Sequence, residues 1–172
     1  RPPHLREKVV VIQVPVPSRE HIFSYENLGR EVNELIGEIN GQFATPHWSP
    51  VVYIRRGISR AQLVALYRLA DIAWISPRRD GMNLVAKEYV ACKADGDGVL
   101  ILSEFAGAAE EMGEALLVNP YDEVGTAALL ETALEMPEDP HILDVFEDLI
   151  GPNIRCWSMA WRVKKADGET FA

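Results

Sequence analysis

The sequence predicts an α/β fold, a doubly wound parallel sheet of the Rossmann-like type with helices on both faces. Three observations support this class. Short apolar runs rich in Val and Ile alternate along the chain with longer segments of helical periodicity. The apolar runs are nearly continuous, which is typical of strands that are buried on both faces of a parallel sheet. The segments between them are long enough for crossover helices, which connect parallel strands in a right-handed sense.

The first four elements follow from local patterns. Residues 8–14 form an apolar, β-branched run that is ended by two prolines, which predicts a strand. Residues 21–41 carry apolar side chains at helical spacing, which predicts an amphipathic helix. Residues 50–54 predict a second strand. Ser59 then caps a second helix, because its hydroxyl can accept a hydrogen bond from a first-turn amide.

The rest of the chain continues this alternation. We expect strands at residues 71–76, 99–103 and 115–118. We expect helices at residues 82–92, 105–112 and 141–150, and a helix that begins at Asp122 or Glu123 and ends at about residue 136. Residues 1–150 are therefore expected to form one domain, and residues 151–172 a C-terminal helical segment or tail. Ligands of such sheets bind beyond the carboxyl ends of the strands, so the loops there are the expected place for a site.

Composition excludes several classes of function. A length of 172 residues suits one domain with a substantial core, and 48% hydrophobic with 25% charged residues is typical of a soluble globular protein. The formal net charge of −9 argues against a nucleic-acid partner, because phosphate backbones select basic surfaces. No run approaches the roughly 20 apolar residues of a membrane span, so we expect no membrane partner. Cys92 and Cys156 lack metal-ligand spacing and are interpreted as reduced thiols of a cytoplasmic protein.

The most informative segment is residues 79–91, RDGMNLVAKEYVA, which follows the strand at residues 71–76. A strand, a glycine-containing turn and a helix start form an anion site, because the first helix amides lack partners and the helix dipole favours negative charge. Glu88 lies on the same helical face as Leu84, one turn further on. An acid at that position can accept hydrogen bonds from a ribose diol. The pattern therefore indicates a nucleotide-sugar site.

The segment at residues 79–88 resembles the signature of the trehalose-6-phosphate synthase family of retaining glycosyltransferases (family 20), which includes the glucosylglycerol-phosphate synthases. Further segments resemble the family in the same order, at residues 14–19, 31–41, 98–109 and 117–122. The likeness extends from about Arg1 to about Trp157. It implies a GT-B architecture of two α/β halves, in which this chain corresponds to the C-terminal, nucleotide-sugar-binding half.

The resemblance implies transfer of glucose from a nucleoside-diphosphate glucose to a phosphorylated acceptor, with retention of configuration. It implies no enzyme nucleophile, no metal and no other cofactor, because the donor diphosphate itself would deprotonate the acceptor. The acceptor-binding N-terminal half, with the arginine and lysine that clamp the diphosphate, would lie before Arg1. We therefore interpret the chain as part of a longer polypeptide and expect the isolated chain to bind donor weakly and to be inactive. The oligomeric state stays open, a homo-oligomer included.

The resemblance also implies roles for individual residues. Asp80 would be the catalytic residue that contacts hydroxyls of the donor glucose, although a local role as a helix N-cap also fits. Glu88 would hold the ribose, and Arg19 the phosphate of the acceptor. Gly81 has a local reason as well, because glycine permits close backbone approach and unusual dihedral angles. The remaining implied contacts are to sugar and diphosphate through the amides of Gly81, Met82, Asn83, Leu84 and Val85, and to the nucleobase through Ile58 and Ser59.

Several alternatives stay open. Ser59-Arg60 stands where relatives usually carry Pro-Phe, which leaves the choice among UDP, ADP and GDP undecided, and Arg78 stands where they usually carry Leu. Pro-Ser-Arg at residues 17–19 favours trehalose 6-phosphate synthesis from UDP-glucose and glucose 6-phosphate. Trp-Ser-Pro at residues 48–50 instead resembles the glucosylglycerol-phosphate synthases, which use ADP-glucose and glycerol 3-phosphate. A non-catalytic interaction or regulatory domain is the alternative of another class. An NAD-binding domain is disfavoured, because no Gly-x-Gly-x-x-Gly follows the first strand.

Overall fold

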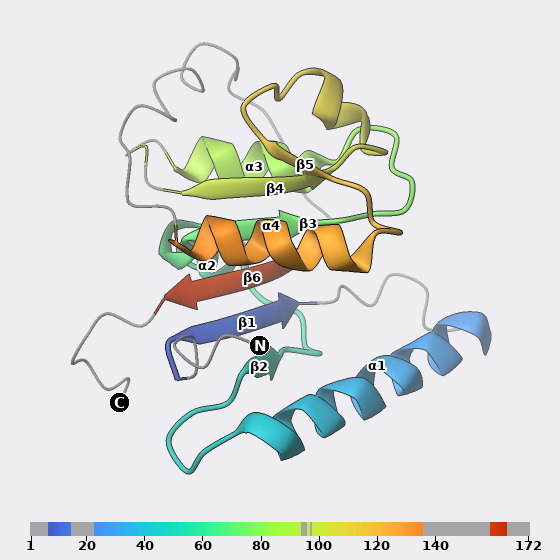
Figure 1. The fold of residues 1–172 in the computed structure, drawn as a ribbon, viewed down its shortest axis with the longest axis vertical. Coiled ribbons are helices and arrows are strands. Elements are labelled where there is room, and N and C mark those ends of the chain that lie inside the picture. Colours follow the sequence, from blue (N-terminus) through green and yellow to red (C-terminus); the bar gives the residue numbers. More distant parts are fainter. Residues whose placement is uncertain (1–6, 15–22, 94–95, 97, 136–158, 165–172) are drawn as a thin grey trace.

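The computed structural model describes residues 7–14, 23–93, 96, 98–135 and 159–164. Figure 1 shows one sheet running through the molecule, with helices packed against it. The strands are β1 (Val9–Val14), β2 (Val51–Tyr53), β3 (Ile72–Ile75), β4 (Val99–Ser103), β5 (Leu116–Val118) and β6 (Met159–Lys164). The helices are α1 (Phe23–Phe43), α2 (Arg60–Leu69), α3 (Leu84–Cys92), α4 (Glu123–Glu135) and the 3-10 helix η2 (Gly107–Glu110).

The sheet has the strand order β2-β1-β6-β3-β4-β5. β1 pairs with β2, β3 with β4, and β4 with β5, all in parallel. β6 is antiparallel to both of its neighbours, β1 and β3, so β1 and β3 run in the same direction. Five strands therefore point the same way, and their carboxyl ends meet at one edge of the sheet. The doubly wound α/β class is confirmed, with one antiparallel strand that the sequence pattern did not predict.

The C-terminal segment differs from the expected helical tail. Residues 159–164 form β6 and lie inside the sheet instead of following it as a helix. The pattern MAWRVK explains the strand, because Met, Trp and Val alternate with Ala, Arg and Lys at the period of two that suits a strand. The expected helix at residues 141–150 and the expected domain boundary at residue 150 fall outside the described residues.

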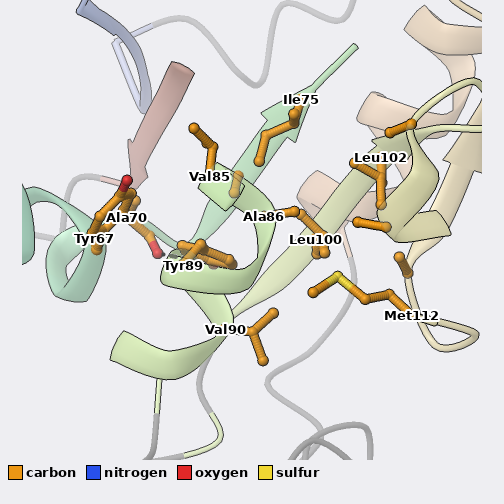
Figure 2. Close-up of a cluster of buried hydrophobic side chains, with 14 of the residues drawn as sticks. Tyr67, Ala70, Ile75, Val85, Ala86, Tyr89, Val90, Leu100, Leu102 and Met112 are labelled. Carbon is orange, nitrogen blue, oxygen red and sulfur yellow. Dashed lines mark hydrogen bonds between the residues drawn. The ribbon is translucent and has the colours of Figure 1, made fainter. Parts of the chain in front are cut away.

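The core consists of two clusters, one on each face of the sheet. The first lies between the sheet and helices α2, α3 and η2, and Figure 2 shows its side chains. The second packs against α4. Successive side chains of β3 and β4 point to opposite faces and supply both clusters: Ala73, Ile75, Leu100 and Leu102 to the first, Ile72 and Ile101 to the second. Burial on both faces is the reason that these strands are continuously apolar.

Helix α1 is tied to the edge strand β2 by a side chain. Asn40 donates from Nδ2 to the Val51 carbonyl at 2.9 Å and accepts at Oδ1 from the Val51 N–H at 3.0 Å. One side-chain amide thus satisfies both main-chain groups of Val51, which would otherwise be unpaired at the sheet edge. Trp48 adds a bond from Nε1 to the Val9 carbonyl at 3.1 Å. These bonds hold the outer part of the sheet, where α1 lies in Figure 1.

Most of the expected elements are confirmed to within about two residues, the usual uncertainty of element ends. The expected strand at residues 99–103 coincides with β4. The expected helix at residues 105–112 is wrong in type, because the structure has only the four-residue 3-10 helix η2 there. Helix α3 begins at Leu84, two residues later than expected, because the chain first completes a polar turn.

Candidate functional site

The candidate site is built on the turn between β3 and α3, at the carboxyl edge of the sheet. Main-chain hydrogen bonds fasten this turn to the loop after β4. The Asp80 N–H donates to the Phe105 carbonyl at 3.3 Å, and the Gly107 N–H donates to the Asp80 carbonyl at 3.1 Å. The Ala108 N–H donates to the Met82 carbonyl at 2.8 Å. The segment that follows β4 therefore fixes the main chain of the turn that precedes α3.

The carboxylate of Asp80 organises the turn from within. Its Oδ1 accepts from the N–H groups of Met82 and Asn83, each at 3.2 Å, and its Oδ2 accepts from Nδ2 of Asn83 at 3.0 Å. The local alternative of a helix N-cap is therefore wrong, because Asp80 shapes the turn three residues before the cap. A carboxylate has about four acceptor positions, so Asp80 retains capacity for further donors such as sugar hydroxyls.

Asn83 is the N-cap of α3 and the special backbone position of the site. Its φ is 67°, in the left-handed region, and its Oδ1 accepts from the Ala86 N–H at 2.9 Å. The side chain is only 5% exposed, so its polar groups depend on these internal partners. From the sequence, only the main-chain amide of Asn83 was expected to contribute. Two properties of asparagine could have predicted its capping role. Asparagine is preferred at N-caps, and it tolerates the left-handed region better than most residues.

Gly81 does not have the unusual, positive φ that its place in the turn suggested. Among the described residues, Gly96 is the glycine with φ above zero, and a β-carbon on Gly81 would meet no protein atom within 4 Å. The close approach occurs instead at Gly107, where a β-carbon would overlap the main-chain carbonyl of Gly81. The glycine that the turn requires thus lies in the neighbouring loop, and Gly81 itself leaves the outer side of the turn open.

The amides at the start of α3 divide into two groups. Those of Met82 and Asn83 are used by Asp80. Within the described residues, the N–H groups of Leu84 and Val85 have no acceptor in the protein. Unpaired N–H groups at a helix N-terminus, together with the helix dipole, favour a bound anion. Of the five amides expected to contact the ligand, those of Met82 and Asn83 therefore donate within the turn instead.

Glu88 lies one helical turn behind these amides and is half-buried. Its Oε2 accepts from the hydroxyl of Tyr67 on α2, at 2.9 Å. Tyr67 is 1% exposed, and its contact with Glu88 was not identified from the sequence. Burial raises the pKa of the Cys92 thiol, one turn further along α3, and the charge of Glu88 raises it further.

The loop expected to contact the nucleobase contains the N-cap of α2. Ser59 is the N-cap of α2: its hydroxyl accepts from the Gln62 N–H at 3.2 Å, and its own N–H donates to Gln62 Oε1 at 2.9 Å. Its carbonyl accepts from the Leu63 N–H. Ser59 thus uses both backbone groups locally, and Ile58 packs against the first core cluster. A nucleobase role for either residue stays a prediction.

Two arginines stand out in the sequence, Arg19 and Arg78. Arg19 lies outside the described residues, so its proposed role toward the acceptor phosphate stays a prediction. Arg78 has its guanidinium carbon 5.4 Å from the ring centroid of Tyr121, and Tyr121 meets Phe105 edge to face at 6.0 Å. This exposed cluster joins the loops after β3, β4 and β5, so Arg78 is partly held by an aromatic ring.

The described part of the chain contains no group of three or more His, Cys, Asp or Glu side chains placed to hold a metal ion. In the same part, no helix combines the length and the apolar character needed to cross a membrane.

Comparison with known proteins gives consistent results. A family model for glycosyltransferase family 20 matches residues 1–147. The chain is 50% identical over 137 residues to the bifunctional trehalose-6-phosphate synthase/phosphatase of Thermoproteus tenax, which covers 80% of this chain and 19% of that protein. It is 46% identical over 132 residues to the UDP-forming alpha,alpha-trehalose-phosphate synthase of Candida albicans, covering 77% and 28%.

Solved structures agree with these relatives. The UDP-forming alpha,alpha-trehalose-phosphate synthase of Burkholderia xenovorans, in complex with glucose-6-phosphate, matches with a TM-score of 0.74 and 42% identity over 80% of this chain and 30% of that chain. An E. coli structure bound with UDP-2-fluoro glucose matches with a TM-score of 0.74 and 38% identity. The match covers 81% of this chain and 32% of that chain. The chain thus spans between 19% and 32% of the length of these four relatives.

Proposed function

This chain belongs to glycosyltransferase family 20, and from that premise we propose that it is the donor-binding part of a retaining glucosyltransferase. The proposed reaction moves glucose from a nucleoside-diphosphate glucose to glucose 6-phosphate and forms trehalose 6-phosphate. The single observation that carries the proposal is the arrangement at α3, where free N–H groups of Leu84 and Val85 precede Glu88 by one turn. The similar proteins named as UDP-forming trehalose-phosphate synthases support the choice of reaction and of UDP.

In the proposed complex, the donor lies along the first turns of α3. The diphosphate accepts hydrogen bonds from the N–H groups of Leu84 and Val85, and the positive end of the helix dipole adds to the attraction. The ribose hydroxyls donate to Glu88. Asp80 lies on the other side of the amides, in the turn, where its remaining acceptor positions can receive hydroxyls of the glucose.

The chemistry proposed for this site requires no nucleophile from the protein. The bond between the glucose anomeric carbon and the diphosphate breaks, and negative charge develops on the leaving diphosphate oxygen. Preorganised N–H groups stabilise that charge because they already point toward it. The acceptor hydroxyl gives its proton to the leaving diphosphate as the new glycosidic bond forms. We propose that this occurs without a metal ion.

The test is calorimetric titration of the chain with UDP, ADP and GDP, in the wild type and in Glu88→Ala. Glu131→Ala is the matched control, because Glu131 is a helix glutamate on the opposite face of the sheet, in α4. We expect UDP to bind best and Glu88→Ala to weaken that binding by about 10-fold or more, as for loss of a hydrogen bond to a charged group. Glu131→Ala should bind as the wild type does.

Other outcomes separate the alternatives. A preference for ADP would favour glucosylglycerol-phosphate synthesis over trehalose 6-phosphate synthesis. Equal binding of UDP by Glu88→Ala and the wild type would contradict the ribose role. If none of the three nucleotides binds, either the diphosphate-clamping residues expected before Arg1 are required or the interaction-domain alternative holds. The same titration on a chain extended at its N-terminus separates these two: binding there supports the donor-binding role, and no binding there contradicts it.

A further inference from the structure

On the basis of the function proposed above, we infer that Tyr67 is a positioning residue for nucleotide recognition. Tyr67 would not touch the ligand. It would hold the Glu88 carboxylate in the orientation that receives the ribose hydroxyls, and so determine how strongly the site distinguishes a ribonucleotide from a nucleotide that lacks the diol.

Tyr67 and Glu88 form a contact between two helices. Tyr67 lies near the end of α2 and Glu88 in the middle of α3, 21 residues apart in the sequence. The Tyr67 hydroxyl donates to Oε2 of Glu88 at 2.9 Å. Both helices lie on the same face of the sheet, and the tyrosine ring belongs to the first core cluster (Figure 2). Tyr67 is 1% exposed, so packing around its ring fixes the position of the hydroxyl.

The bond from Tyr67 leaves one carboxylate oxygen of Glu88 available for a ligand. A carboxylate accepts only, through two oxygens. Tyr67 occupies Oε2, and among the described residues the structure gives Oε1 no hydrogen-bond partner. A glutamate side chain is long and loses rotamer freedom when a ligand fixes it. Because Tyr67 already restricts Glu88, less ordering is left for the ligand, which is the general benefit of preorganisation.

A second buried tyrosine, Tyr89, uses its hydroxyl differently. Tyr89 is 2% exposed and lies in the same core cluster. Its hydroxyl donates to the main-chain carbonyls of Ala70 and Asp71, at 3.2 and 3.1 Å. That arrangement joins main-chain segments. Tyr67 instead donates to a charged side chain that faces the proposed ribose position, so the two tyrosines share burial and size but differ in what their hydroxyls control.

The test measures dissociation constants of UDP and of 2′,3′-dideoxy-UDP for the wild type, Tyr67→Phe and the control Tyr89→Phe. Phenylalanine keeps the ring and removes the hydroxyl. We expect Tyr67→Phe to weaken UDP binding about 3- to 10-fold, a part of the value of a hydrogen bond to a charged group. The dissociation constant of dideoxy-UDP should change by less than about 2-fold, since that ligand offers no diol. Tyr89→Phe should leave the ratio of the two constants as in the wild type.

A second measurement separates positioning from general loss of structure. Tyr67→Phe is repeated in a Glu88→Ala background, where no carboxylate remains to be oriented. We expect the additional effect on UDP binding to disappear, because the coupling between two contacting residues is lost when one partner is absent. Thermal unfolding of each variant, followed by circular dichroism, verifies that the fold is retained.

The outcomes distinguish failure of this inference from failure of the proposed function. If the wild type prefers UDP to dideoxy-UDP and Tyr67→Phe keeps the full preference, the positioning role is overturned while the site stands. The same holds if Tyr67→Phe weakens both ligands equally, or weakens UDP as strongly in the Glu88→Ala background. If the wild type itself shows no preference for UDP, the ribose role of Glu88 is wrong and the role of Tyr67 falls with it.

Discussion

Asp80 and Asn83 hold each other across the turn that begins α3, through a hydrogen bond of 3.0 Å from the Asn83 side-chain amide to Oδ2 of Asp80. Asn83 at the same time caps the helix with its other side-chain atom, Oδ1. The same two residues therefore define the turn and the first helix amides. Any group bound at those amides meets a backbone that is already fixed.

The first prediction concerns Asn83. Asn83→Ala should lower the free energy of unfolding by about 1–3 kcal/mol, because it removes an N-cap and places alanine in the left-handed region. Asn83→Gly is the matched variant, since glycine accepts a φ of 67° without strain and loses only the side-chain bonds. The measurement is urea unfolding of both variants. A loss below about 0.5 kcal/mol for Asn83→Ala would contradict the structural role given to the cap.

The second prediction concerns the contact between Gly107 and Gly81. Gly107→Ala should destabilise the protein by about 1–3 kcal/mol, as expected for overpacking, because the new β-carbon meets a main-chain carbonyl that cannot rotate away. It should also weaken UDP binding, since the displaced carbonyl belongs to the site turn. Gly113→Ala is the control, because a β-carbon there meets nothing within 4 Å. Equal stability and equal UDP affinity of the two variants would refute the close approach.

The sequence was sufficient for much of the sheet because the strands carry a local signal. β4 is a run of five apolar or small residues with buried side chains on both faces, and this burial produced the continuous pattern that predicted it. β6 was missed because six residues of alternating pattern are weak evidence beside a proline-rich, charged segment. The insertion of β6 between β1 and β3 is a property of long-range pairing, which no local pattern contains.

The site was predictable in its position but not in its internal bonds. The order of strand, turn and helix indicated where an anion would bind, and Glu88 followed from helical spacing. The partner of Glu88 could not be found in this way, because Tyr67 reaches it across a helix–helix contact. The angle and register of that contact depend on packing of α2 and α3 on the sheet. Likewise, the close approach of Gly107 to the Gly81 carbonyl joins the start of η2 to a turn 26 residues earlier in the sequence.

The third prediction concerns Asn40 at the sheet edge. Asn40→Ala should destabilise the protein by about 1–3 kcal/mol, because both main-chain groups of Val51 lose their partner. Asn40→Asp should cost a similar amount, since an aspartate cannot donate to the Val51 carbonyl. Hydrogen exchange of the Val51 amide reports the bond directly and should accelerate in both variants. Unchanged exchange at Val51 in Asn40→Ala would show that this contact does not protect the strand.

The fourth prediction uses the Cys92 thiol as a reporter of charge beside the site. Burial raises the pKa of this thiol, the charge of Glu88 raises it further, and Arg68 and Arg60 lower it. Only the thiolate is alkylated rapidly, so the pH at which iodoacetamide reaches half its maximal rate should lie above that of a free cysteine. Glu88→Gln removes a negative charge that opposes the thiolate and should move this pH downward. Arg68→Gln removes a favourable positive charge and should move it upward.

The measurement is the alkylation rate of Cys92 as a function of pH, in a Cys156→Ser background so that one thiol reacts. Arg78→Gln is the control, because Arg78 is not among the charges that act on Cys92. The opposite signs expected for Glu88→Gln and Arg68→Gln make the result independent of general loosening, which would accelerate alkylation in both variants. Shifts of the same sign in both would mean that Glu88 does not carry its charge next to Cys92, and would also weaken the case for Glu88 as an ionised ribose acceptor.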